Sequence, residues 1–147
     1  MSQKSSRQSG IRRTELLVKD VMTRNVIMIS DSASIAEAAR MMRKSGAGCL
    51  AVERTSQIVG IITERDCIRA LASRQPETVR VTDVMSTPLV TIGPNDTLSK
   101  AVSILVEKRM QRLPVMDGQH IVGILTSADL ARYYDKMSRY SIRTVGP

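Results

Sequence analysis

The sequence predicts an α+β fold built from two tandem β-α-β-β-α repeats that pack with pseudo-twofold symmetry. The first observation is an internal repeat: residues 18–69 align without a gap with residues 81–132, and 15 of these 52 positions are identical. The second is that apolar residues in each copy recur in short strand-like runs and at helical spacing. One copy is too small to bury both faces of its sheet, so we expect the two sheets to pair and complete a shared core.

The first copy predicts a strand, a helix, two further strands and a second helix. Apolar residues at 26–29 predict the first strand. The first helix is expected to start at Ser34, which has the S-x-x-E spacing of a capping box, and to end at Gly46. Strands are expected at 49–53 and 58–63, and the second helix follows them. The core-facing stripe of the first helix is predicted to be Ile35, Ala38, Ala39 and Met42.

The second copy repeats this order with different residues. Its first strand is expected at 89–92, and Thr97 takes the position of the helix cap. Two strands at 113–116 and 120–126 are joined through Asp117-Gly118, a strong hairpin signal. The apolar stripe of the intervening helix is predicted to be Leu98, Ala101, Val102 and Leu105.

The predicted two-repeat fold divides the chain into five segments. We expect a basic, flexible N-terminal tail at 1–17, the first repeat at 18–73, a linker at 74–80, the second repeat at 81–136 and a C-terminal tail at 137–147. Polar, turn-forming residues between the copies indicate the linker.

The composition is that of a globular protein, with 42% hydrophobic and 24% charged residues among 147. No apolar run approaches the roughly 20 residues that a membrane-spanning helix needs, and residues 1–10 are polar where a signal peptide would be apolar. Cys49 and Cys67 form no CxxC pair and are too few for a disulfide scaffold. We therefore expect a cytoplasmic protein with reduced thiols and no membrane contact.

The net charge of +8 makes nucleic acid a second candidate partner. Residues 1–17 carry +3 and residues 134–147 carry +2, so five of the eight excess charges lie in the two ends. A basic end rich in Ser, Gln, Lys and Arg is usually a solvated segment. Three Tyr, with no Phe or Trp, leave few rings on which bases could stack. Nucleic-acid binding through the tails is therefore kept as an alternative.

Polar residues recur at one place in both copies. Thr63-Glu-Arg-Asp66 and Thr126-Ser-Ala-Asp129 each follow an apolar strand and open a helix. Capping alone explains both motifs, because T-x-x-D is close to the capping box. A functional interpretation is that such a corner directs N–H groups toward phosphate, while a short carboxylate accepts hydrogen bonds from the two hydroxyls of a ribose. The motif by itself leaves both interpretations open.

The repeated elements together resemble a pair of CBS domains, the Bateman module. The resemblance rests on Gly60-Ile-Ile-Thr63-Glu-Arg-Asp66 and Gly123-Ile-Leu-Thr126-Ser-Ala-Asp129, on a leading Val-x-Asp-Val-Met in each copy and on Arg112-Leu-Pro-Val115. It covers residues 18 to about 135. It implies a regulatory module that binds AMP, ADP, ATP or S-adenosylmethionine in clefts between the repeats and signals the ligand state to a protein partner. It also implies a homodimer in which two modules form a flat disc through their helices.

The resemblance also implies roles for particular residues. The motif Asp holds the ribose and the motif Thr contacts sugar or phosphate. Arg109-Met-Gln-Arg112 is similar to the stretch that presents a His-Arg pair to phosphate in the kinase-regulating members, although Gln111 stands in place of that His. Arg65 is the candidate phosphate-binding cation of the first copy. Adenine needs apolar walls, for which the apolar residues of the set below are the candidates. The full set of candidate nucleotide-binding residues is Thr63, Arg65, Asp66, Val26, Leu89, Met110, Gln111, Arg112, Pro114, Thr126 and Asp129.

Catalytic chemistry has few candidate residues in this chain. The single His120 lies in a predicted hairpin, so neither a Ser/His/Asp nor a Cys/His constellation can be assembled around it. Candidate metal ligands are equally few. We predict a protein that is not an enzyme and needs neither a metal nor a cofactor. Which cleft binds stays open, and a structural dimerisation module with empty clefts is the remaining alternative.

Overall fold

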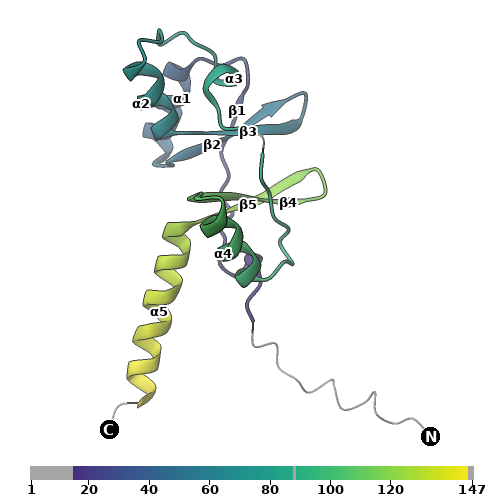
Figure 1. Cartoon of the computed structure of the whole chain (residues 1–147), viewed down its shortest axis with the longest axis vertical. Helices are drawn as coiled ribbons and strands as arrows, with labels where there is room; N and C mark the ends of the chain where they lie inside the picture. The colour runs from purple at the N-terminus through teal and green to yellow at the C-terminus, as the bar shows by residue number, and fades with distance from the viewer. Residues whose placement is uncertain (1–14, 88, 146–147) are drawn as a thin grey trace, which may run out of the picture.

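The computed structural model describes residues 15–87 and 89–145, with side chains up to residue 139. Two lobes lie one above the other, each with helices beside its own small sheet (Figure 1). The first lobe contains β1 Met28–Ser30, α1 Ile35–Ser45, β2 Cys49–Arg54, β3 Gln57–Thr63 and α2 Glu64–Ala72. The second contains α4 Leu98–Glu107, β4 Arg112–Asp117, β5 His120–Thr126 and α5 Ser127–Val145. Two short helical segments, η2 Val18–Asp20 and α3 Val81–Val84, precede the lobes in sequence.

The predicted helix boundaries are confirmed. The Ser34 hydroxyl accepts a hydrogen bond from the Glu37 N–H at 3.1 Å, and Gly46 ends α1 with a left-handed φ of 74°. In the second repeat the Thr97 hydroxyl caps α4 by accepting from the Lys100 N–H at 3.2 Å. The predicted stripes face the cores, except that Ala39 is exposed and Val102 is half-buried and lies outside the second core.

The expected strand at 89–92 is not formed, which leaves β4 and β5 as a two-stranded sheet. Only Ile92 pairs there, as an isolated parallel bridge to Val115. In the first repeat the Ala51 N–H donates to the Ile27 carbonyl at 2.9 Å and helps to align β1 beside β2. The repeat offset places Pro114 at the position of Ala51, and proline has no N–H to donate.

Each lobe has its own hydrophobic core, so the expectation of one shared core is wrong. The first core contains Leu50, Val52 and Ile62, and the second contains Leu113 and Leu125 among others. Each core is completed by the leading segment of the other copy. Val18 and Met22 lie in the second core, whereas Val81 lies in the first.

Two motif glycines allow this exchange of leading segments. A Cβ on Gly60 would lie 2.7 Å from the Met85 sulfur, and a Cβ on Gly123 would lie 2.6 Å from the Met22 sulfur. Backbone bridges accompany these contacts, with Ile61 paired to Ser86 and Ile124 to Thr23. The repeated Gly and Met are therefore explained by packing between copies, not within them.

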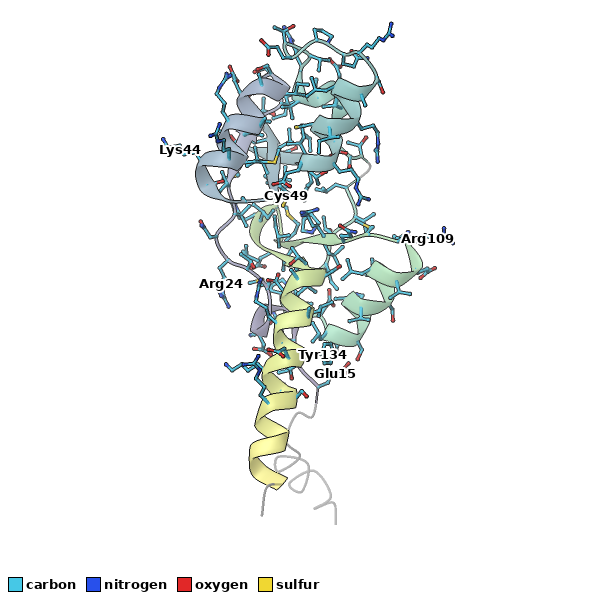
Figure 2. The ribbon with its side chains drawn as sticks, turned by 90° about the vertical axis from the view of Figure 1, so that its left-hand side faces the viewer. Glu15, Arg24, Lys44, Cys49, Arg109 and Tyr134 are labelled. Carbon is cyan, nitrogen blue, oxygen red and sulfur yellow. The ribbon has the colours of Figure 1, made fainter. Side chains whose placement is uncertain are left out.

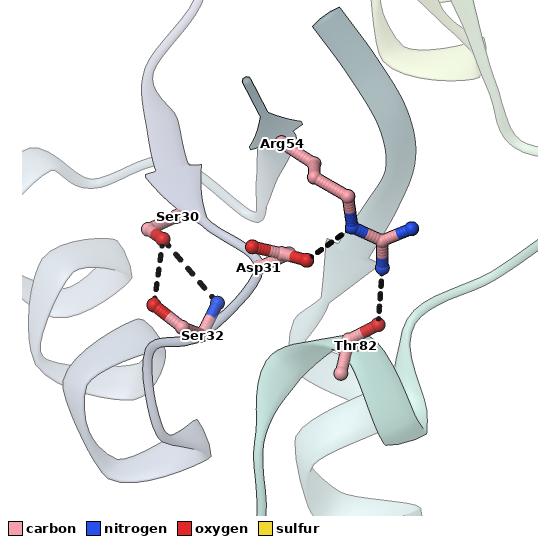
Figure 3. Close-up of polar contacts among 5 residues, drawn as sticks. All are labelled: Ser30, Asp31, Ser32, Arg54 and Thr82. Atoms are coloured by element: carbon pink, nitrogen blue, oxygen red, sulfur yellow. Dashed lines mark hydrogen bonds and ion pairs between the residues drawn. The ribbon is translucent and has the colours of Figure 1, made fainter. Parts of the chain in front are cut away.

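A polar cluster fastens α3 to the first lobe (Figure 3). Nε of Arg54 lies 2.5 Å from the Asp31 carboxylate, and a second guanidinium nitrogen donates to the Thr82 hydroxyl at 3.0 Å. Ser30 and Ser32 share a hydrogen bond of 2.9 Å in the same turn. The cluster joins the end of β1, the end of β2 and the start of α3.

The ends of the chain differ in part from the expected tails. Residues 1–14 of the expected N-terminal tail lie outside the described residues, but Leu17 forms an antiparallel bridge with Thr97. At the other end α5 runs to Val145, so most of the segment expected as a C-terminal tail from residue 137 is helical.

Candidate functional site

The two repeated Thr-x-x-Asp motifs form reciprocal capping boxes where a strand turns into a helix. The Thr63 N–H donates to Oδ2 of Asp66 at 2.9 Å, and the Asp66 N–H donates to the Thr63 hydroxyl at 3.2 Å. The corresponding distances between Thr126 and Asp129 are 2.9 Å and 3.0 Å. Both carboxylates are buried, so each motif fixes an acidic group at a strand–helix corner.

A cleft of about 280 Å³ opens beside Asp66 and is lined from both repeats. It brings together eight of the eleven candidate residues: Thr63, Arg65, Asp66, Leu89, Met110, Gln111, Arg112 and Pro114. Val26, Thr126 and Asp129 do not line it. The repeat offset relates Val26 to Leu89, Thr126 to Thr63 and Asp129 to Asp66, so these three residues belong to the pseudosymmetric position.

Five further residues line the cleft and were outside the candidate set, although Arg109 belongs to the stretch already singled out before β4: Ile61, Arg69, Ser86, Val90 and Arg109. A signal for Arg69 was present, because Arg69 and Arg132 are identical in the two copies and follow the motif Asp by three residues. Side chains spaced i, i+3 share a helix face, which places Arg69 beside Asp66. Ser86 directly follows the repeated Val-x-Asp-Val-Met of the second copy. It lines the cleft because this leading segment packs against the first lobe, which the sequence did not predict.

Four arginines make the cleft strongly cationic. Arg65 and Arg69 come from α2, whereas Arg109 lies between α4 and β4 and Arg112 begins β4. Guanidinium groups engage phosphate oxygens in pairs, and water-shielded sites strengthen that attraction. Asp66 is the only carboxylate among the described lining residues. The cleft therefore favours an anionic ligand.

The cleft also has an apolar lining. Ile61, Leu89, Val90, Met110 and Pro114 supply aliphatic and thioether surface from both repeats. A flat ring system inserted there would contact both lobes at once. The combination of an apolar wall, one buried carboxylate and several cations is typical of a site for a small amphipathic anion.

Arg112 reaches from the second lobe to the first. A Cβ on Gly48 would lie 2.7 Å from one of its guanidinium nitrogens, so the guanidinium group sits directly against the first-lobe backbone and would have to shift if residue 48 had a side chain. Cys49 follows Gly48 and lies between the two lobes (Figure 2). Burial raises the pKa of the Cys49 thiol, while the positive charge of Arg112 acts in the opposite direction. The thiol is therefore protonated near neutral pH and is a poor nucleophile.

Asp66 and Asp129 differ in the partners of their second carboxylate oxygen. The Thr23 hydroxyl donates to Oδ1 of Asp129 at 2.8 Å, and Arg132 forms an ion pair with the same oxygen. At Asp66 the Ser86 hydroxyl lies 3.4 Å from Oδ2, and the nearest guanidinium nitrogen of Arg69 is 4.0 Å from Oδ1. Oδ1 of Asp66 therefore keeps its lone pairs for an incoming hydroxyl group.

Comparison with known proteins places this architecture in a family. The CBS domain family matches residues 18–73 and residues 81–136. The chain belongs to the CBS domain family. It is 36% identical over 115 residues to the CBS domain-containing protein YhcV of Bacillus subtilis, a match that covers 78% of this chain and 82% of YhcV.

Other members combine or use the CBS pair in different ways. The homoserine O-acetyltransferase of Methanosphaerula palustris is 36% identical over 118 residues, but the match covers only 24% of that enzyme. The chain likewise spans 60% and 41% of the length of two further archaeal relatives. Among solved structures, the CBS domain pair of protein MJ0100 in complex with methylthioadenosine and S-adenosyl-L-methionine has a TM-score of 0.77 and 26% identity, covering 84% of this chain and 98% of that one.

The described residues contain neither a membrane-spanning helix nor a metal-binding cluster. None of the helices between residues 15 and 145 is long and apolar enough to cross a membrane. Within the same part of the chain, His, Cys, Asp and Glu side chains do not gather into a group that could hold a metal ion.

Proposed function

We propose that this CBS pair is a non-catalytic regulatory module that binds an adenosine-containing ligand in the Asp66 cleft and signals the ligand state to a partner. The observation that carries the proposal is the arrangement of that cleft, in which a buried carboxylate with an open oxygen faces an apolar wall and four arginines. The complexes of the MJ0100 pair with two adenosyl compounds support the choice of ligand class.

Each part of the ligand has a matching group in the cleft. The ribose hydroxyls donate to Oδ1 of Asp66, which no described hydrogen bond occupies. The adenine ring packs against Leu89, Met110 and Pro114. The phosphates accept from the arginines, of which Arg112 already spans both lobes. This charge pattern favours AMP, ADP or ATP over S-adenosylmethionine, whose sulfonium group is positively charged.

Signalling follows from the position of the cleft between two lobes. A ligand that contacts both lobes favours the packing in which it makes the most contacts, and it shifts that equilibrium only by its differential affinity for the two states. The outer helices carry this change to a partner or to a second copy of the chain. Exposed apolar side chains on α2, α4 and α5 are suited to such contacts: Ile68, Leu71, Val106, Tyr134 and Met137.

Thermal unfolding in the presence of AMP, ADP, ATP, NAD and S-adenosylmethionine tests the proposal. A ligand that binds only the native state raises the midpoint, by an amount equivalent to about 2.7 kcal/mol at a concentration 100 times its Kd. We expect a rise with the adenine nucleotides that Asp66→Asn abolishes. Asp117→Asn is the matched control, because it removes one exposed carboxylate at the end of β4.

Two outcomes would count against the proposal. No rise with any of the five compounds would favour the structural module with empty clefts. A rise that persists undiminished in Asp66→Asn would place the ligand elsewhere on the molecule.

A further inference from the structure

We propose that each chain binds one ligand rather than two, because Arg132 and Thr23 close the second repeat's Asp129 against a ribose. This inference rests on the proposed function of the Asp66 cleft. It concerns the two pseudosymmetric carboxylates, which share the same motif: both lie in Thr-x-x-Asp, and both are followed after three residues by arginine.

Three interactions within the protein hold the carboxylate of Asp129. Its Oδ2 accepts the Thr126 N–H, while its Oδ1 accepts the Thr23 hydroxyl and pairs with Arg132. The Asp129 side chain is only 2% exposed. A carboxylate has about four lone-pair positions, so three are taken and the fourth is buried. A ribose diol needs two acceptor positions that face the ligand.

The same groups are looser at Asp66. Arg69 is the pseudosymmetric equivalent of Arg132 and is equally exposed, at 70%, but its guanidinium nitrogen stays 4.0 Å from the carboxylate. Ser86 replaces Thr23, and its hydroxyl lies 3.4 Å away on Oδ2 rather than 2.8 Å away on Oδ1. The open oxygen therefore exists in one repeat and not in the other.

A ligand at Asp129 would have to replace two existing interactions before it gained its own. Removing the charged partner of a buried carboxylate is destabilising unless the ligand provides an interaction of similar strength. Two neutral ribose hydroxyls do not match a guanidinium. Arg132 thus acts as a positioning residue for Asp129. It keeps the Asp129 carboxylate in a structural role, in which Asp129 joins Thr23 of the leading segment to α5.

Titration calorimetry of the whole chain measures the stoichiometry directly, with AMP, ATP and S-adenosylmethionine as separate probes. The wild type should bind one molecule per chain. Asp129→Asn should keep that stoichiometry, and Asp66→Asn should lose it. Arg132→Ala should bind a second molecule, and adding Asp129→Asn to that variant should remove the second molecule again.

Arg69→Ala is the matched control. It deletes the equivalent arginine at a carboxylate that is already open, so affinity changes but the stoichiometry stays at one. A measurement without ligand checks the closure itself: the unfolding midpoint should fall more in Arg132→Ala than in Arg69→Ala, because only Arg132 pairs closely with its Asp. Circular dichroism confirms that both variants are folded.

The outcomes separate this inference from the function on which it rests. Two molecules per wild-type chain, or one per chain in Arg132→Ala, would overturn the closure of Asp129 and leave the proposed function standing. No binding of any probe to wild type or Arg132→Ala would overturn both.

Discussion

Arg109 adopts a backbone conformation that an arginine rarely adopts. Its φ is 53°, in the left-handed region, at the position where the first repeat has Gly46 with a φ of 74°. That conformation costs a residue with a Cβ about 1–2 kcal/mol. Because Arg109 also lines the Asp66 cleft, we interpret the cost as offset by a function that glycine lacks, namely a cation directed at the ligand.

Arg109→Gly should therefore stabilise the free protein and weaken ligand binding. Relief of the strained φ, reduced by the greater freedom of glycine in the unfolded chain, should raise the unfolding free energy by up to about 1 kcal/mol. Loss of one charged hydrogen bond to phosphate should weaken nucleotide binding about tenfold. Urea unfolding and calorimetric titration measure the two effects.

Arg74→Gly is a matched control for this prediction. Arg74 has a similar φ of 63° but does not line the cleft. The control should be stabilised without a change in affinity. Equal affinities for Arg109→Gly and wild type would show that Arg109 makes no contact with the ligand.

The elements show which parts of the fold the sequence could predict. Helix caps and hairpins depend on residues close in sequence, so Ser34, Gly46 and Asp117-Gly118 marked them correctly. The missing strand at 89–92 depends on Pro114, a residue of another strand that cannot donate the pairing hydrogen bond. The exchange of leading segments was equally invisible, because an apolar Val or Met has the same pattern whichever core it enters.

The turn before α4 should make the stability of the protein depend on pH. Oδ2 of Asp96 accepts the Gly93 N–H at 2.8 Å and Oδ1 pairs with Lys100 at 3.3 Å, and together these hold the pKa of Asp96 below its ordinary value of 3.8. A lowered folded-state pKa gives stability that is complete above the unfolded-state value and is lost as the pH falls through the folded-state value. The loss therefore lies below about pH 4.

Asp96→Asn should remove this part of the acid dependence. Urea unfolding between about pH 5 and pH 2.5 should show a shallower loss of stability in the variant than in the wild type. Asp117→Asn, measured in parallel, accounts for the removal of one negative charge. Identical slopes for Asp96→Asn and wild type would contradict a native-state role for this carboxylate.

In the molecule taken as one unit, the sequence predicted which residues gather at the cleft but not which of the two carboxylates stays open. Thr63, Asp66 and the Arg112 stretch were found because they recur or resemble a family motif, and the structure places them around one cleft. Nothing in the motif distinguishes Asp66 from Asp129. Their difference arises from the exchange of Thr23 for Ser86 and from the positions of Arg69 and Arg132 in space, which identical sequence spacing leaves undetermined.

The exposed apolar side chains of the outer helices predict that the chain forms a homodimer through these helices. Ile68 and Leu71 on α2 are 67% and 55% exposed, and Tyr134 on α5 is 59% exposed. Both helices lie on the same side of the stacked sheets (Figures 1 and 2). Burying such side chains against a second copy contributes roughly 25 cal/mol for each Å² of apolar surface removed from water.

Sedimentation of the wild type at micromolar concentrations should therefore show a dimer. The double variant Ile68→Asp, Leu71→Asp should shift it toward monomer, because burying a charge without a partner at an interface is costly. Met28→Asp is the control, since Met28 is 46% exposed but lies on β1 rather than on a helix. A dimer that survives the α2 substitutions and is lost in Met28→Asp would place the interface at the sheet edge. A wild type that sediments only as monomer, with and without nucleotide, would mean that the ligand state must be read by a different protein.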